Sequence, residues 1–290
     1  MTGTTTPERK VPTRRISFEE SLRDLPKHFA AENDLIGSHL MAVLSGVFPD
    51  GEDFFVRSVR HFRGDVTDPA LKRQVAGFIG QEAMHGREHR ALNDRLAELG
   101  YPTKRVEKVI KWSLGTRERI MSPLSNLAAT AALEHFTATF AELLLSNERA
   151  REMVGGRALD LFLWHALEES EHKAVAFDVY KAVGGTERMR VWTMNALTVG
   201  FIFAIAFETF LSLLGDRSTY KPGRLVASWK RFYRSPFMSP KLWHQLRDYN
   251  RPDFHPDDSD TEALVERWKE ELFGAHGTLN DKLTTSTAAA

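Results

Sequence analysis

Two stretches of the sequence carry the same pair of metal-binding side chains at the same spacing. Glu82 and His85 are separated by two residues, and Glu169 and His172 repeat this Glu-x-x-His pattern. On a helix, residues three apart lie on one face about one turn apart, so the carboxylate and the imidazole of each pair can bind one ion. The repeated pattern therefore predicts a metal centre built from helices.

Each pair is preceded by a solitary glutamate on an earlier apolar segment. Glu52 lies thirty residues before Glu82, and Glu134 lies thirty-five residues before Glu169. A glutamate followed by Glu-x-x-His, present twice, is typical of bundles that hold two metal ions between four helices. The sequence predicts an all-α, ferritin-like four-helix bundle with extra C-terminal helices. Its predicted ligands are Glu52, Glu82, His85, Glu134, Glu169 and His172.

The expected helix lengths agree with this arrangement. One helix should begin near Asp50, and the next should run from Pro69 to a stop at Gly100. If the two form an antiparallel hairpin, a rise of about 1.5 Å per residue brings Glu52 and Glu82 within roughly 6 Å of the same depth. The second hairpin turns at a pair of glycines and brings its two glutamates within roughly 9 Å of the same depth by the same rise.

The residues around the two pairs predict that both are buried. Val75, Phe78 and Ile79 share a helical stripe with the first pair, and Leu161 and Val175 flank the second. Four carboxylates gathered in a core would repel one another or take up protons. Two divalent cations would relieve both effects. The pattern therefore favours a metal centre over two solvated surface pairs.

Two further histidines lie on the same stripes. His165 precedes Glu169 by four residues, and His89 follows His85 by four. Each is a candidate metal ligand, a partner that orients a ligand, or a proton shuttle, so both are candidate catalytic residues. His165 is the stronger candidate for a seventh ligand. Glu168 competes with Glu169, because it too can share a face with the histidine of the second pair.

Two other groups of polar residues are expected to have structural roles. His135 is next to Glu134 but points about 100° away on the helix, so packing is its expected role. His255 and Asp257 lie in a proline-containing loop before a helix, where turn and capping roles are expected.

Five segments carry a resemblance to a known family: FPDGEDFFVRSVR, FIGQEAMHGREH, ALEHFTATFAE, WHALEESEHKAVAFDVY and RPDFHPDD. Through them the chain resembles, over roughly residues 15 to 275, the bacterial proteins catalogued as predicted metal-dependent hydrolases. The resemblance implies metal binding and a ferritin-like helical fold. A histidine at the position of His165 also resembles the arrangement in di-iron arylamine N-oxygenases.

The ligand types indicate which metals and reactions to expect. Oxygen and nitrogen donors without sulfur suit iron, which we favour, or manganese, and Glu82 and Glu169 are the candidates to bridge two such ions. The preferred hypothesis is a di-iron oxidase or oxygenase that acts on a small or lipid-like apolar substrate and takes electrons from an external donor. One alternative is a hydrolase that uses a metal-activated water, with His89 or His165 as the general base. A metal-storage bundle without turnover is the second alternative.

The amino-acid composition argues against several other classes of protein and site. The chain has 39 basic and 39 acidic residues, so no net field attracts nucleic acid. The absence of cysteine excludes disulfides, thiolate zinc sites, iron–sulfur clusters and a cysteine nucleophile. The polar N-terminus lacks the apolar stretch of a signal peptide, so a cytoplasmic location is expected.

The C-terminal part of the chain differs in character from the bundle. The predicted organisation is a flexible tail over 1–14, the dimetal bundle over 15–185, an apolar and aromatic helical extension packed on the bundle over 186–278, and a second tail over 279–290. Residues 192–214 are long enough to span a bilayer, but Asn195 and Glu208 argue against a lipid-exposed span. A buried helix or a homodimer interface is expected there. Peripheral membrane contact stays open, because the next segment interleaves basic and aromatic residues.

Overall fold

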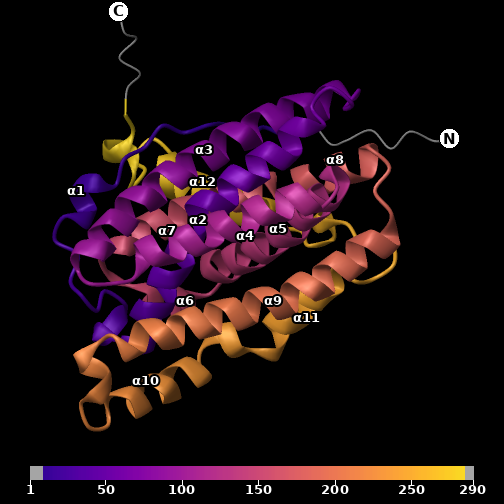
Figure 1. Cartoon of the computed structure of the whole chain (residues 1–290). Helices are drawn as coiled ribbons and strands as arrows, with labels where there is room; N and C mark the ends of the chain where they lie inside the picture. The colour runs from indigo at the N-terminus through magenta and orange to yellow at the C-terminus, as the bar shows by residue number, and fades with distance from the viewer. Residues whose placement is uncertain (1–8, 285–290) are drawn as a thin grey trace, which may run out of the picture.

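The computed structural model describes residues 9–284, and within this range every regular element is a helix (Figure 1). A single isolated bridge joins Ile16 and Leu283 near the two ends of the described chain. The predicted all-α fold class is therefore confirmed.

Four long helices carry the predicted ligands: α2 (Leu35–His61), α3 (Pro69–Glu98), α5 (Pro123–Ser146) and α7 (Leu159–His172). The short turn between α2 and α3 makes these two helices an antiparallel hairpin, and α5 and α7 form a second hairpin through the short helix α6 (Glu148–Val154). Contacts between α2 and α5 and between α3 and α7 join the two hairpins.

Local signals set the ends of α3. The Asp68 side chain accepts a hydrogen bond from the Ala70 amide at the first turn, and Pro69 occupies the first helical position. At the other end Gly100 has a φ of +91°, a conformation that glycine adopts without strain. The predicted course of this helix matches the structure.

The predicted start of the preceding helix, near Asp50, is wrong. Helix α2 begins fifteen residues earlier at Leu35 and continues through Pro49. A proline inside a helix leaves the carbonyl four residues before it without its usual partner. Here that carbonyl belongs to Ser45, and the Asn93 side-chain amide of α3 donates to it at 3.0 Å. A contact from another helix thus compensates for the break.

The N-terminal segment is packed where a tail over residues 1–14 was predicted, as far as it is described. Val11 and Thr13 lie so close to α3 that only glycine fits beneath them. A Cβ atom at Gly77 would lie 2.2 Å from the Val11 carbonyl oxygen, and one at Gly80 would lie 2.0 Å from Thr13 Oγ1. The first eight residues lie outside the described range.

The remaining α-helices surround this core: α1 (Glu19–Leu22), α4 (Thr103–Ile120), α8 (Val175–Ala182), α9 (Glu187–Leu214), α10 (Arg224–Tyr233), α11 (Pro240–Asp248) and α12 (Glu262–Phe273). Leu279, where a C-terminal tail was predicted to begin, is fully buried. The rest of that predicted tail from residue 285 onward lies outside the described range. Figure 1 shows α9 lying along one side of the bundle with α10 and α11 beside it.

Helix α9 is the one helix of the described chain that is long and apolar enough to cross a membrane, judged by length and composition. Only 11% of its most apolar window is buried inside the protein. The expectation of a buried helix is therefore wrong. The residues that α9 does bury include Thr193, Thr209 and Ser212, so its polar side faces the bundle and much of its apolar side faces outward.

Two hydrophobic clusters fill the bundle, and the predicted ligands lie between them. Along α3, Val75 and Phe78 belong to one cluster, whereas Leu92 and Leu96 belong to the other. The ligand pair of α3, Glu82 and His85, lies in the segment between Phe78 and Leu92. The ionisable residues therefore occupy a layer enclosed by apolar packing on both sides.

Candidate metal centre

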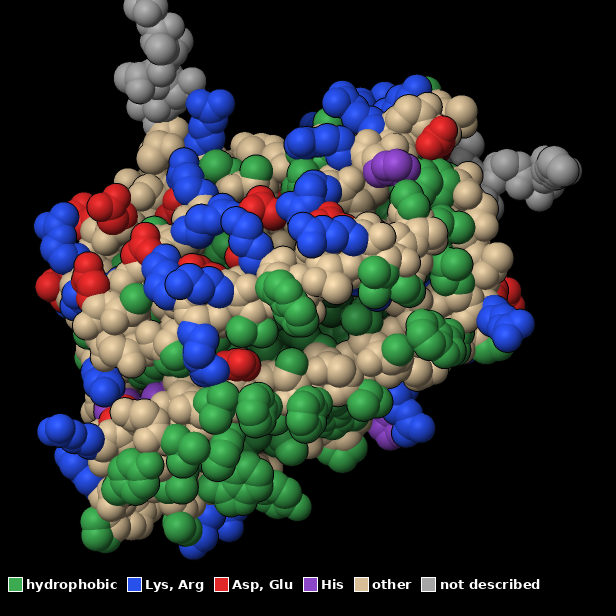
Figure 2. Space-filling model, in the orientation of Figure 1, with side chains coloured by type: hydrophobic (Ala, Val, Ile, Leu, Met, Phe, Trp, Pro, Cys, Tyr) green, Lys and Arg blue, Asp and Glu red, His purple; other side chains and the backbone are tan. Residues whose placement is uncertain are grey.

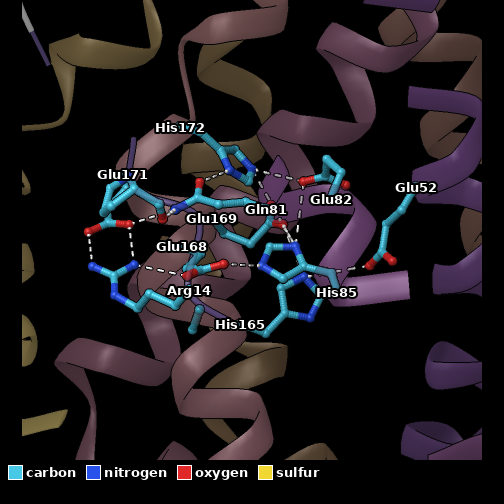
Figure 3. A network of polar contacts seen from close by, with 12 residues as sticks. Arg14, Glu52, Gln81, Glu82, His85, His165, Glu168, Glu169, Glu171 and His172 are labelled. Carbon is cyan, nitrogen blue, oxygen red and sulfur yellow. Dashed lines mark hydrogen bonds and ion pairs between the residues drawn. The ribbon is translucent and has the colours of Figure 1, made fainter. Parts of the chain in front are cut away.

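All seven predicted ligands converge between the four long helices. They are Glu52 from α2, Glu82 and His85 from α3, Glu134 from α5, and His165, Glu169 and His172 from α7. None is more than 5% exposed. In Figure 3 the side chains of His85, His172, Glu82 and Glu169 point toward a common centre.

The shortest distances define the middle of the centre. His172 Nε2 lies 3.2 Å from Glu82 Oε1, 3.3 Å from Glu134 Oε2 and 3.5 Å from Glu169 Oε1. His85 Nδ1 lies 3.5 Å from the same oxygens of Glu82 and Glu169. Several overlapping groups of three residues bring their donor atoms within 4.8 Å of one another. The residues that belong to two of these groups are Glu52, Glu82, His85, His165 and Glu169.

Most of these donor atoms have no hydrogen-bond partner among the described residues. They are both oxygens of Glu52, Glu82 and Glu134, Oε2 of Glu169, Nδ1 of His85 and Nε2 of His172. A buried polar atom without a partner costs on the order of 1–3 kcal/mol, and more when it is charged. Divalent cations held by these oxygen and nitrogen donors would remove that cost, so the residues present fit a metal centre.

The tautomer of His172 follows from its neighbour Gln81. The Gln81 amide nitrogen donates to the Pro12 carbonyl at 3.0 Å and to Glu171 at 2.8 Å. Its amide oxygen must therefore accept from His172 Nδ1, which lies 2.8 Å away. In the neutral ring this leaves the lone pair of Nε2 directed at the carboxylates, as a metal ligand requires.

A longer chain of hydrogen bonds orients His165. Asn93 donates through its amide nitrogen to the Ser45 carbonyl and to a carboxylate of α4, so its oxygen accepts from the Ser45 hydroxyl at 2.7 Å. Ser45 Oγ then accepts from His89 Nδ1 at 2.9 Å, and His89 Nε2 accepts from His165 Nδ1 at 2.8 Å. His165 Nε2 is left unprotonated, 3.0 Å from Glu169 Oε1.

Glu168 holds a ligand in place and is not itself among the converging donors. His85 Nε2 lies 3.1 Å from Glu168 Oε2, so it donates to that carboxylate, and its Nδ1 faces the centre. The other oxygen of Glu168 accepts from Arg14 at 2.9 Å, and Arg14 also pairs with Glu171 (Figure 3). In their neutral forms, three imidazoles therefore direct an unprotonated nitrogen at the same carboxylates.

The carboxylates change the protonation of the metal-free centre. Burial and neighbouring carboxylates raise the pKa of Glu52 and of Glu82 well above the usual value, and they raise the pKa of Glu134 to about 7. Burial opposes the charge of His172, but Glu169 and Glu134 hold its pKa well above its usual value. Burial also opposes ionisation of Glu169, yet His172 keeps its pKa well below the usual value. The metal-free centre therefore holds protons that a metal must displace.

The two additional histidines differ in their suitability as bases. Burial and the neighbouring His85 lower the pKa of His165 to about 4, so this ring is neutral at pH 7 and offers its nitrogen to a metal. Burial and His165 lower the pKa of His89 well below its usual value, and both of its ring nitrogens are engaged. His89 therefore orients His165, although one of its ring nitrogens also lies within 4.8 Å of donor atoms of Glu52 and His165.

Sequence reasoning missed the residues that orient the ligands. Gln81 lies four residues before His85 on the buried stripe of α3, and this spacing was a signal that could have identified it. Arg14 lies in a polar segment that has no local signature of structure. Asn93 acts through its contact with α2, which only the folded chain brings about.

His135 lies outside the centre. Its Nε2 donates to the Gln245 carbonyl at 3.0 Å, and its ring packs against Tyr249 and Phe254. We expect His135→Ala to destabilise the protein by roughly 1–3 kcal/mol through lost packing and an unpaired carbonyl, while metal stoichiometry stays that of the wild type. Elemental analysis of the folded variant after metal loading and dialysis checks this. A loss of bound metal would place His135 among the ligands.

Comparison with known families identifies the kind of protein. The sequence profile of a family described as "Predicted metal-dependent hydrolase" matches residues 12–260. Comparisons with curated proteins and with solved structures gave no match. The preferred hypothesis of a di-iron oxidase or oxygenase is corrected by this match, which supports the hydrolase alternative. Carboxylate and histidine donors between helices suit both chemistries, so ligand type alone could not separate them. The chain belongs to the family of predicted metal-dependent hydrolases.

Proposed function

We propose that this protein hydrolyses an ester or phosphoester bond with two divalent metal ions held between α2, α3, α5 and α7. The proposal rests on the group of buried carboxylate oxygens and imidazole nitrogens that have no other partner among the described residues. The family match supports hydrolysis as the reaction.

The overlapping groups of donors suggest how two ions would be shared. Glu82 and Glu169 would bridge them, because Oε1 of each lies within 3.5 Å of both His85 Nδ1 and His172 Nε2. Glu134 and His172 would hold one ion, since their donor atoms lie 3.3 Å apart. Glu52 would hold the other ion with His85 and His165. Bound there, the ions would supply a water of lowered pKa as the nucleophile.

The chain keeps the donors oriented and the centre dry. Trp164 packs edge-on against His85, and Phe78 packs edge-on against His172, both at 4.9 Å between ring centroids. Phe48 covers His165 at 4.9 Å in the same way. Because these rings exclude water, charges at the centre interact more strongly than they would in solvent. A pKa of about 4 makes His165 a better metal ligand than proton acceptor.

Hydrolysis should require the metal and no oxygen. We expect protein stripped by a chelator to lose activity on chromogenic carboxylic and phosphate esters, and to regain it when manganese, zinc or ferrous ions are added under anaerobic conditions. Ester cleavage that survives complete metal removal would contradict the proposal. So would metal-loaded protein that cleaves neither class of ester.

A further inference from the structure

The outer face of α9 and α10 is apolar and exposed. In Figure 2 it forms a broad green area along the lower side of the molecule, where Figure 1 places these helices. The exposed side chains on α9 include Trp192, Val199, Phe203, Phe207 and Phe210, which are 48–72% exposed, and those on α10 are Leu225, Val226, Trp229 and Tyr233, which are 37–66% exposed. We call these nine residues the apolar face.

Helix α10 has its polar side turned inward. Ser228 is only 2% exposed, and its hydroxyl donates to the Asp34 carboxylate at 2.9 Å. Arg231 pairs with Asp34 and with Glu32 on the same side. A helix on a water-facing surface normally buries its apolar side. Here the polar side contacts the rest of the protein, so the apolar side is exposed and can contact another apolar surface.

Both ends of α9 are fixed to the protein, so this helix lies along the surface and is not free to span a bilayer. At its first turn the buried Arg190 donates to the backbone carbonyls of Tyr249 and Arg251. Just past its last turn, Asp216 lies 2.8 Å from His28 Nε2 and 3.2 Å from His39 Nε2. A helix held in this way can present one face to the interface of a membrane.

The segment that contains α10 and most of α11 is strongly basic. Residues 217–247 contain eight basic and no acidic residues, although the whole chain has 39 of each. Lys221, Lys230 and Arg234 are exposed, and none of them forms an ion pair within residues 9–284. Aromatic residues with polar tips, such as Trp229 and Tyr233, suit the boundary between water and lipid.

We propose that the apolar face docks this protein on the surface of an anionic lipid bilayer, with α9 and α10 lying in the plane of the interface. The apolar side chains would enter the acyl boundary, and the basic residues would contact anionic headgroups. A second copy of the chain fits less well, because a symmetric contact through this face would bring the two basic segments together. This proposal does not depend on the chemistry of the metal centre.

Sedimentation with vesicles tests the proposal on the full chain. We expect the protein to sediment with vesicles of phosphatidylcholine and phosphatidylglycerol, to bind pure phosphatidylcholine more weakly, and to be released as salt rises. The triple variant Lys221→Gln, Lys230→Gln, Arg234→Gln should weaken binding to the mixed vesicles by on the order of 100-fold. Trp229→Glu, which introduces a charge into the apolar face, should abolish binding.

A matched triple variant controls for overall charge. Arg60, Arg63 and Lys72 are exposed near the turn between α2 and α3, and their replacement by glutamine should leave vesicle binding unchanged. Equal loss in both triple variants, or no sedimentation of the wild type with anionic vesicles, would overturn the proposal. Analytical ultracentrifugation tests the alternative, in which a second copy of the chain binds the apolar face. A wild-type dimer that Trp229→Glu converts to a monomer, without lipid binding by either, would assign the face to a second copy.

Discussion

Replacing Glu82 with glutamine should stabilise the metal-free protein and remove the stabilisation that metal ions provide. Glu82 is 1% exposed, and neither carboxylate oxygen has a hydrogen-bond partner within the described chain. Its pKa is raised well above the usual value by burial and by Glu134, so the folded state must hold a proton that the unfolded state releases at neutral pH. Glutamine does not incur this cost. We expect the metal-free variant to gain roughly 1–3 kcal/mol at pH 8.

The same substitution should abolish the response to metal. Saturating manganese or zinc should raise the melting temperature of the wild type and leave that of Glu82→Gln nearly unchanged, because a bridging donor is lost. Ester hydrolysis should fall by on the order of 100-fold or more. Calorimetric melting with and without metal measures both effects.

Glu88 is a matched control on the same helix. It is also buried, but its carboxylate accepts from the Phe18 amide and from Arg87 at 2.8 Å each. Glu88→Gln should therefore destabilise the metal-free protein and keep the metal response. If Glu82→Gln behaves like Glu88→Gln, or binds metal as the wild type does, Glu82 is not a ligand.

The stability of the metal-free protein should fall as pH rises from about 6.5 to 8. In this range the folded state binds protons more tightly than the unfolded state, because the pKa values of Glu52, Glu82 and His172 are raised well above their usual values and the pKa of Glu134 is raised to about 7. The folded state then binds more protons than the unfolded state, so a rising pH favours unfolding. Each such proton changes the unfolding free energy by about 1.4 kcal/mol per pH unit.

Saturating metal should remove this dependence, since it takes the place of the protons. Metal affinity should correspondingly rise with pH over the same interval. Histidines that are neutral in the folded state, such as His165 with its pKa of about 4, oppose this trend in part near pH 6.5, because their unfolded counterparts are about half protonated there. Their contribution disappears as the pH approaches about 8. Urea unfolding at a series of pH values, with and without manganese, tests this. If the free energy of unfolding of the metal-free protein stayed constant between pH 6.5 and 8, the carboxylates would not have the raised pKa values described above.

The parts of the molecule that depend on local sequence could be predicted. Asp68 and Pro69 mark the start of α3, Gly100 marks its end, and the two Glu-x-x-His pairs show which faces meet. These signals act over a few residues, so they can be recognised in the sequence without knowledge of the fold. The convergence of all seven predicted ligands followed from helical periodicity together with the burial of charge.

Features that depend on contacts between distant segments could not be predicted. A helix was expected to begin near Asp50, and nothing near Pro49 in the sequence shows that Asn93 supplies the hydrogen bond that lets α2 continue through this proline. Arg14 stood in what resembled a tail, although it pairs with Glu168 across 154 residues of sequence. The apolar side of α9 was expected to lie in a buried core or in a homodimer interface, since hydrophobicity alone does not distinguish the two, and only the first alternative is contradicted by its exposure.

The side chain of Asn93 connects the proline in α2 with the chemistry of the centre. Its nitrogen satisfies the carbonyl that Pro49 leaves free, and this bond fixes which way round the amide lies. The amide oxygen is then aimed at the hydroxyl of Ser45, which determines the tautomers of two successive imidazoles. The backbone hydrogen bond that is missing at Pro49 thus determines which nitrogen His165 offers to a cation. The proline in α2 therefore helps to orient a metal ligand.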